Sequence, residues 1–271
     1  MILPGEIQKT ASKLRLRDTQ IEKDYLIGWL LYGISKNLFL KRNLIFKGGT
    51  AIRKAFIKDY RLSEDLDFTA IVNELDLEKT KKQFDSLINW VYDKSRINLQ
   101  IIDETIHHTE NYTLYFSYSG PLGSTTTNKK IKMDISLSEI LCSEIKENSV
   151  SHKYSDIKER FSILCYSIDE IICEKLRSLM QRTMSRDLYD VWFLLEEYSI
   201  NIEDQYHNFS KKATHKNIDY KNFVSTVTKK ESIFKKQWQL QLAEQIYDLP
   251  NFEDVWRNLK KHWKRLEKAI K

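Results

Sequence analysis

Glycine, proline and cysteine are all scarce in this chain of 271 residues, which has 7, 3 and 3 of them. The cysteines are odd in number and lack metal-type spacing, which argues against a disulfide framework and a zinc site. The longest hydrophobic run near the N-terminus covers residues 25–34, whereas a membrane span needs about 20 apolar residues. No small-residue cleavage site of a secretory signal follows this run. We therefore expect a reduced, cytoplasmic protein with no membrane segment.

The charge is distributed unevenly. The whole chain carries a net charge of +6, with 44 basic and 38 acidic residues. The 71 residues from position 201 onward carry all of this excess, since they hold 15 basic and 9 acidic residues. A basic C-terminal region is able to contact a polyanion such as RNA, but it is also typical of an ordinary solvated helix face.

Alternating and helical patterns predict an α/β N-terminal part, residues 1–160. The first forty residues read as helix, and helices also fit 50–56 and 75–91. The expected strands cover residues 44–47, 65–72, 98–106, 111–119 and 129–137, the last two forming an antiparallel pair.

After residue 160 the pattern becomes helical, which predicts a C-terminal helical bundle over residues 161–271. Ser167 and Glu170 form a capping box at the start of a helix over 168–181. Ser185 is expected to cap the next helix, and three further helices fit the remainder.

Two of the few glycines stand side by side, in the run Lys47-Gly48-Gly49-Thr50 directly after a predicted strand. Backbone amides exposed at a glycine turn before a helix make a site for anions. The hydroxyl of Thr50 and the charge of Lys47 would add to such a site. By itself the pattern also fits an ordinary turn between a strand and a helix.

Aspartates follow with strand spacing. Asp65 and Asp67 are two residues apart, so on a strand both carboxylates point to one face. A third carboxylate, Asp134, lies in the alternating run 131–137, on the face opposite Ile131, Met133 and Ile135. Carboxylate oxygens are the ligands that Mg²⁺ prefers, and two such ions can clamp an in-line phosphoryl displacement. We therefore predict a magnesium site at these three residues.

Two charged residues in the helical part are weaker candidates for the nucleotide site. Lys175 lies inside the capped helix, and Asp187 lies near the start of the next helix. Lys175 could bind a triphosphate as a point charge, while Asp187 could position a base, a ribose or Lys175 itself. The same residues could equally form ordinary ion pairs.

Taken together, these motifs resemble the AbiEii/AbiGii abortive-infection toxin family of nucleotidyltransferases, within the polymerase-beta-like superfamily. The resemblance runs from about Lys23 to Tyr198. It rests on five blocks, which are Lys47-Gly-Gly-Thr50, Arg61-x-Ser63-x-Asp65-x-Asp67, Asp134, Glu174-Lys-Leu-Arg177 and Arg186-Asp-Leu-Tyr-Asp190.

The resemblance implies an α+β fold, a polymerase-beta-like nucleotidyltransferase domain with a mixed sheet followed by a helical bundle. It implies an NTP substrate, Mg²⁺, an acceptor that in some members is tRNA, and a separately encoded antitoxin. Asp65, Asp67 and Asp134 would hold the metal and act in catalysis with Lys175 and Asp187. The residues expected to contact the nucleotide are Lys47, Gly48, Gly49, Thr50 and Ser63.

Two other interpretations stay open. In one, the fold is catalytically inactive and binds RNA or a protein through its basic C-terminal helices, with Lys260, Lys261, Lys264 and Arg265 as the contact surface. In the other, the protein is an enzyme whose acceptor is a protein side chain or a small molecule.

Overall fold

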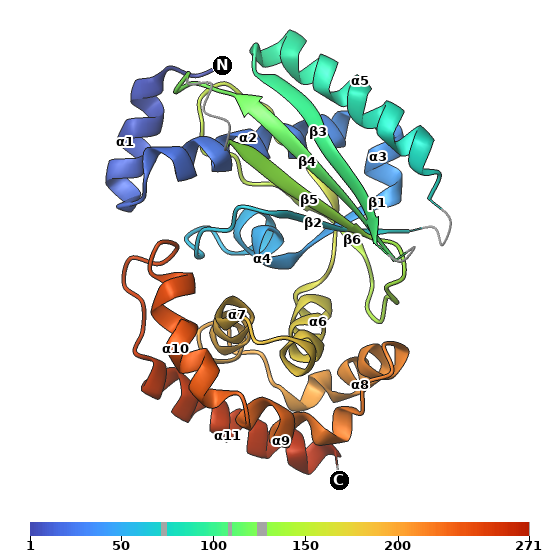
Figure 1. The fold of residues 1–271 in the computed structure, drawn as a ribbon, viewed down its shortest axis with the longest axis vertical. Helices are drawn as coiled ribbons and strands as arrows, with labels where there is room; N and C mark the ends of the chain where they lie inside the picture. Colours follow the sequence, from blue (N-terminus) through green and yellow to red (C-terminus); the bar gives the residue numbers. More distant parts are fainter. Residues whose placement is uncertain (72–74, 108–109, 124–128, 271) are drawn as a thin grey trace. The chain divides into compact units, whose positions relative to one another are not determined.

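A seven-stranded mixed sheet forms the centre of the N-terminal part of the chain (Figure 1). The computed structural model describes residues 1–271 other than 72–74, 108–109, 124–128 and 271. These residues form two units, which we call the sheet unit (1–139 and 145–166) and the helical unit (140–144 and 167–271). The strands are β1 (Leu44–Lys47), β2 (Leu66–Ala70), β3 (Asn98–His107), β4 (Asn111–Ser119), β5 (Lys130–Ser136), β6 (Lys146–Ser149) and β7 (Ser162–Cys165).

The strand order is β3-β4-β5-β2-β1-β7-β6. Strand β2 lies between two partners, antiparallel to β1 and parallel to β5. The sheet is therefore mixed at the point where the aspartates lie. The α+β fold class expected from the sequence is confirmed.

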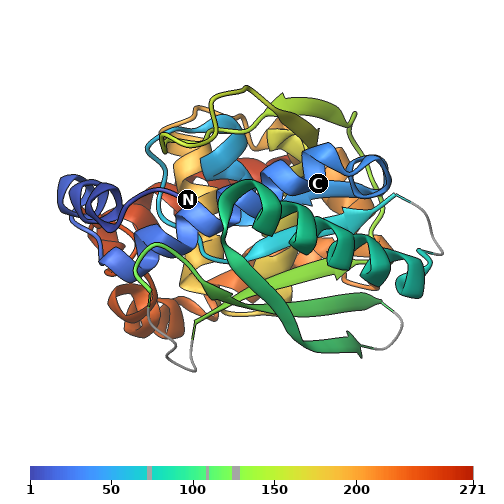
Figure 2. The same cartoon turned by 90° about the horizontal axis from the view of Figure 1, so that it is seen from above.

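Helices cover the sheet unit on its flanks. They are α1 (Pro4–Leu14), α2 (Asp18–Lys36), α3 (Leu38–Asn43), α4 (Gly48–Ala51), the π-helical turn η1 (Ile52–Phe56) and α5 (Leu77–Ser95). Helix α5 lies along β3 and packs against α2 (Figure 2). The core between helices and sheet is formed by apolar side chains that alternate along the strands, such as Phe46, Phe68 and Met133, none of which is exposed.

The helical unit contains α6 (Ile168–Gln181), α7 (Ser185–Glu196), η2 (Glu203–Gln205), α8 (Tyr206–His215), η3 (Tyr220–Asn222), α9 (Phe223–Thr228), α10 (Glu231–Leu242) and α11 (Phe252–Ile270). As the sequence predicts, Ser167 caps α6 by accepting a hydrogen bond from the Glu170 amide at 3.1 Å. The apolar stripe of α11 buries Val255, Leu259, Trp263 and Leu266. Large aromatic side chains, among them Trp238 and Trp256, fill the core of the unit.

Several local expectations need correction. The segment after Phe161 is not wholly helical, because β7 pairs in parallel with β1 at Phe46 and Cys165. The division expected after residue 160 therefore lies at Tyr166, and residues 140–144 group with the helical unit. Ser185 does not cap α7, because its hydroxyl donates to the Phe234 carbonyl at 3.2 Å. Four α-helices, not three, follow residue 201 in the described part of the chain. The strand expected over 65–72 begins at Leu66, and its last position, Val72, lies outside the described residues.

Among the described residues, each helix is too short or too polar to cross a membrane.

Candidate active site

The turn after β1 needs glycine for two separate reasons. Gly48 has a φ of 78°, in the left-handed region that side chains disfavour. A Cβ atom at Gly48 would also collide with the Asp67 carboxylate. At Gly49 a Cβ would lie 2.8 Å from Arg61 Nη2 and 3.1 Å from Ser63 Oγ. The backbone of the turn is therefore in direct contact with side chains of the 61–67 segment.

Strand register brings the aspartates of β2 and β5 together. Lys47 of β1 pairs with Asp67 of β2, and Asp67 pairs with Asp134 of β5. The neighbours of Asp67 on the strand, Leu66 and Phe68, are fully buried, while Asp65 and Asp67 are partly exposed. Asp67 thus lies on the face opposite the core, whereas Asp65 directly precedes β2, which begins at Leu66, and its place on that face stays a prediction.

Both oxygens of the Asp134 carboxylate have donors. Thr113 of β4 donates to Oδ1 at 2.6 Å, and Lys132 Nζ lies 2.6 Å from Oδ2. Partial burial would lower the pKa of Lys132, but Asp134, and more weakly Asp65, raise it above its ordinary value. Lys132 is therefore a counter-ion within the group of acidic residues, and it stays protonated beside them.

Hydrogen bonds attach the segment that carries Asp65 to the start of the helix. Thr50, which is fully buried, donates from its hydroxyl to the Asp65 carbonyl oxygen, and this hydroxyl lies 2.9 Å from that of Ser63. Arg53 Nη1 donates to the Tyr60 carbonyl at 2.6 Å. In this conformation Thr50 and Ser63 hold the loop in place, and their contact with a nucleotide stays a prediction.

The side chain of Lys47, at the end of β1, is largely buried, with 6% of its surface exposed. Its Nζ donates to Ser136 Oγ at 3.1 Å and lies 5.6 Å from the centre of the Tyr166 ring. The amino group thus sits near β5 on the face of the sheet that carries Asp67 and Asp134, because Ser136 and Asp134 are two residues apart on β5.

The donor chemistry of the three aspartates suits Mg²⁺, which prefers carboxylate oxygens. Across the described part of the chain, however, no three histidine, cysteine, aspartate or glutamate side chains gather closely enough to hold a metal ion. Asp67 and Asp134 occupy paired backbone positions, and the Lys132 amino group takes one oxygen of Asp134. The backbone arrangement is compatible with a metal site, while the side chains adopt a different set of contacts.

In the helical unit, Lys175 and Asp187 form an ion pair in which Asp187 is buried and Lys175 is 12% exposed. Lys175 Nζ lies 2.6 Å from Asp187 Oδ1 and 2.9 Å from Asp190 Oδ2, and Arg182 Nε lies 2.8 Å from Asp187 Oδ2. Burial alone would raise the pKa of Asp187, but Lys175 and Arg182 hold it below its ordinary value. Both Asp187 oxygens contact cations, so among the roles considered for it the positioning of Lys175 fits best.

Sequence reasoning did not single out Lys132, Thr113 or Arg182. The alternation of the 131–137 segment places Lys132 on the same face as Asp134, and this is the sequence feature from which Lys132 could have been identified. Thr113 lies opposite Asp134 only through the β4–β5 register, which the pattern of one strand does not specify.

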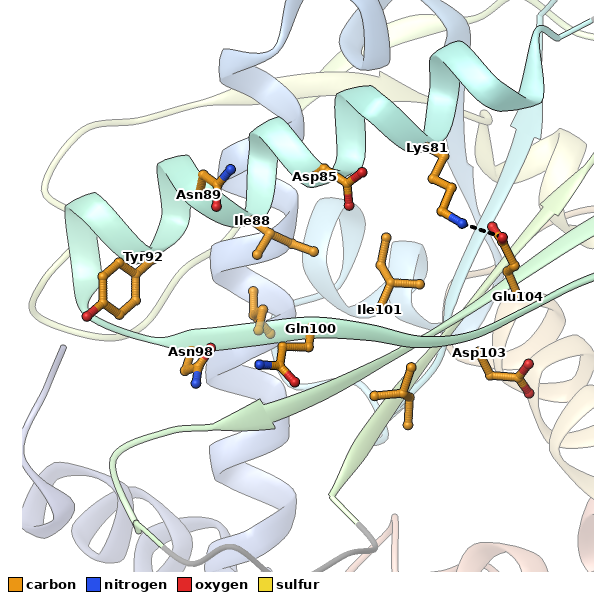
Figure 3. A pocket seen from close by; sticks show the side chains of 12 residues that line it. Lys81, Asp85, Ile88, Asn89, Tyr92, Asn98, Gln100, Ile101, Asp103 and Glu104 are labelled. Atoms are coloured by element: carbon orange, nitrogen blue, oxygen red, sulfur yellow. Dashed lines mark hydrogen bonds and ion pairs between the residues drawn. The ribbon is translucent and has the colours of Figure 1, made fainter.

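A cavity of about 1020 Å³ lies between α5 and β3 (Figure 3). None of the predicted site residues lines it. Its charged side chains are Lys81, which pairs with Glu104, together with Asp85 and Asp103. This acidic lining disfavours a triphosphate, so we do not place the nucleotide there.

Comparison with known proteins identifies the family and the fold. The sequence profile of a family described as "Nucleotidyl transferase AbiEii toxin, Type IV TA system" matches residues 29–258, and so extends well beyond the motifs. The structure of JHP933 from Helicobacter pylori is similar, with a TM-score of 0.57, 19% identity and 94% coverage of each chain. MenT4, a nucleotidyltransferase toxin from Mycobacterium tuberculosis H37Rv, has a TM-score of 0.52 and 15% identity, over 100% of this chain and 98% of that one. A search of curated protein sequences finds no match.

At these identities the two structures establish the likeness of fold, and the family profile covers most of the chain. The protein is a nucleotidyltransferase, and it belongs to the AbiEii family of toxins.

Proposed function

We propose that this protein transfers a nucleotide from an NTP to a hydroxyl group of an RNA acceptor, with tRNA as the acceptor class, in a reaction that requires Mg²⁺. The observation that carries the proposal is the register Lys47–Asp67–Asp134 across β1, β2 and β5, directly beside the Gly48 turn. In keeping with the toxin family, we also propose that a separately encoded antitoxin opposes this activity in the cytoplasm.

Asp65, Asp67 and Asp134 are the proposed metal ligands. When bound, Mg²⁺ supplies positive charge against the phosphate oxygens and the departing pyrophosphate. For Asp134 Oδ2 to bind a metal, the Lys132 amino group has to move away from this oxygen. The Lys132 side chain is 39% exposed, so it has room to turn into solvent.

The triphosphate is proposed to contact the turn at Gly48 and Gly49. Backbone amides are strong donors to phosphate oxygens, and an absent Cβ lets the phosphate approach the main chain closely. Lys47 adds a positive charge from below, while Thr50 and Ser63 fix the loop. For Lys175 of the helical unit, a role in phosphate binding stays a prediction, and Asp187 would hold its amino group in orientation.

The proposed reaction is an in-line displacement at the α-phosphorus. The acceptor oxygen forms a bond to this phosphorus, the bond from it to the bridging oxygen of the β-phosphate breaks, and pyrophosphate leaves. The proton of the acceptor hydroxyl passes to Asp134. Positioning and charge neutralisation account for the acceleration, and the chain forms no covalent intermediate.

The test is a transfer assay with purified protein, each labelled NTP in turn, and bulk tRNA, with and without Mg²⁺. We expect label in the RNA for at least one NTP, and a loss of about 100-fold or more in Asp67→Asn. Asp103→Asn is the matched control, since it neutralises an exposed aspartate of β3 that lies in the acidic cavity. Absence of transfer with all four NTPs, or full activity of Asp67→Asn, would count against the proposal.

The basic helix α11 favours a second candidate function. Lys260, Lys261 and Lys264 are exposed, whereas Arg265 pairs with Glu203. If the protein only binds RNA through this surface, binding should weaken steeply with salt and should not respond to Asp67→Asn. Intact-mass measurement of protein and small-molecule acceptors separates RNA transfer from the remaining alternative.

A further inference from the structure

A basic cavity of about 450 Å³ lies in the sheet unit, between the η1 segment and residues 149–160. Five cationic side chains line it, against one acidic side chain, Glu159. The cationic residues are Arg53, Lys54, Lys58, Lys158 and Arg160. None of the residues assigned to nucleotide or metal lines this cavity, so it is a separate feature of the unit.

Two of the cations are buried and share a single carboxylate. Arg53 Nε lies 3.3 Å from Asp24 Oδ1, and Lys54 Nζ lies 2.8 Å from Asp24 Oδ2. Arg53 is 8% exposed and Lys54 is 4% exposed. One carboxylate neutralises only one of the two charges, so the buried cluster is short of negative charge. Burial lowers the pKa of Lys54, and an anion in the cavity would stabilise its protonated form.

The other three cations have no side-chain partner among the residues that the structure describes. Lys58, Lys158 and Arg160 are exposed, and within the described residues their side chains make no hydrogen bond or ion pair. The acidic residue between the last two, Glu159, is already paired with Lys36 at 3.0 Å. The rim of the cavity therefore carries positive charge that no described residue neutralises.

The cavity is connected to the proposed nucleotide site by one continuous helical segment. Gly48 begins α4, and η1 continues it to Phe56, beside Lys58. At about 1.5 Å per residue these positions are roughly 12 Å apart along the axis. A stacked nucleic-acid strand advances about 3.4 Å per nucleotide, so the separation corresponds to about four nucleotides.

We infer that this cavity binds the phosphate backbone of the RNA acceptor, a few nucleotides from the end that reacts. The cations come from two chain segments, so they are spread over the cavity and its rim. A nucleic-acid strand, which carries one phosphate per nucleotide, can contact several of them at once, whereas a single small anion cannot. The identity of the ligand as the acceptor rests on the proposed function, whereas the binding of RNA at the cavity does not require catalysis.

The test compares two charge-reversed double variants of the full chain. Lys158→Glu with Arg160→Glu changes the rim. Lys82→Glu with Lys94→Glu makes the same change of charge at two exposed positions of α5 whose side chains have no ion pair within the described residues. Binding of fluorescently labelled bulk tRNA is measured by anisotropy from 50 to 300 mM KCl without NTP. Thermal unfolding by circular dichroism verifies that each variant is folded.

We expect the rim variant to bind tRNA about tenfold more weakly at 100 mM KCl and, because two phosphate contacts are lost, to reduce the slope of log affinity against log salt by about 1.5. The α5 variant should stay within about twofold of the parent, because its loss reflects net charge alone. Lys158→Arg with Arg160→Lys should bind like the parent. Equal loss in both double variants, or no loss in the rim variant, would overturn the inference. So would rim-dependent binding to phosphatidylserine vesicles without any effect on tRNA.

Transfer kinetics separate this inference from the proposed function. If the parent transfers a nucleotide, the rim variant should raise KM for tRNA about tenfold and leave kcat and KM for the NTP unchanged. If the parent transfers nothing, the proposed function fails, while the anisotropy comparison still decides whether the cavity binds RNA.

Discussion

Adding one methyl group at each of three glycines tests the account of the Gly48 turn. Gly48→Ala places a Cβ against the Asp67 carboxylate, at a residue whose φ is 78°. Gly49→Ala places a Cβ 2.8 Å from the end of the flexible Arg61 side chain. Gly5→Ala has no atom within 4 Å of the new Cβ and lies in helix α1. The chemical change is the same in all three, so differences in outcome come from the surroundings.

The expected magnitudes differ in size and in sign. A side chain in the left-handed region costs about 1–2 kcal/mol, and overpacking against Asp67 adds about 1–3 kcal/mol. Gly48→Ala should therefore lower the free energy of unfolding by about 2–5 kcal/mol. Gly49→Ala should cost less than about 1 kcal/mol, because a side-chain end is able to move. Gly5→Ala should stabilise by about 0.5 kcal/mol, because alanine favours helix over glycine.

Urea unfolding, followed by tryptophan fluorescence and circular dichroism, measures these free energies. In the transfer assay, Gly48→Ala should reduce activity further than its stability loss explains, since Asp67 has to move. A Gly48→Ala variant as stable as Gly5→Ala would refute the reasoning, because it would mean that neither the backbone angle nor the contact with Asp67 constrains the turn.

Three further predictions follow from the ion pairs. Lys132→Met should tighten Mg²⁺ binding about two- to fivefold by isothermal titration calorimetry, since a partly exposed pair with Asp134 is worth about 0.5–1 kcal/mol; weaker binding would contradict the counter-ion role. Asp187→Asn should lower the free energy of unfolding by about 3 kcal/mol, because it leaves Lys175 with less negative charge in a buried position; an unchanged urea midpoint would contradict this. Asp24 and Asp187 have pKa values lowered in the folded state, so their stabilisation is complete above the unfolded pKa of about 4 and is lost as the pH falls below it. The urea concentration at the midpoint of unfolding should therefore decrease when the pH is lowered from about 4 to 3, and Asp24→Asn should make this decrease smaller. A midpoint that increases on acidification would contradict the predicted direction of the pH dependence.

Local patterns predicted the part of the fold that carries the aspartates. The alternation of the 131–137 segment placed Asp134 opposite a buried face, and Ile131, Met133 and Ile135 are indeed fully buried. The Glu170 carboxylate does not complete the expected capping box, because it accepts from the Cys142 amide and pairs with Lys212. Ser167 nevertheless caps α6 and so specified its start. These predictions succeeded because neighbouring residues alone determine the strand face and the helix cap.

Features set by distant segments escaped prediction. Strand β6 has the sequence Lys-Glu-Asn-Ser, which carries no apolar alternation, and its strand conformation comes from pairing with β7. Helix α7 begins at Ser185 itself, so Met184 holds the cap position, and the Ser185 hydroxyl donates to the Phe234 carbonyl near α10. The Lys132–Asp134 contact is formed between side chains, and the alternation of the strand alone does not specify it. The basic cavity joins two segments that lie about a hundred residues apart in the sequence, so no local pattern predicts it.

The most direct test is anomalous diffraction from crystals soaked with Mn²⁺ in place of Mg²⁺. The account predicts a manganese peak in contact with the carboxylates of Asp67 and Asp134, with the Lys132 amino group moved away from Asp134. A peak located elsewhere, or ordered crystals in which Lys132 keeps its contact at saturating Mn²⁺, would contradict it.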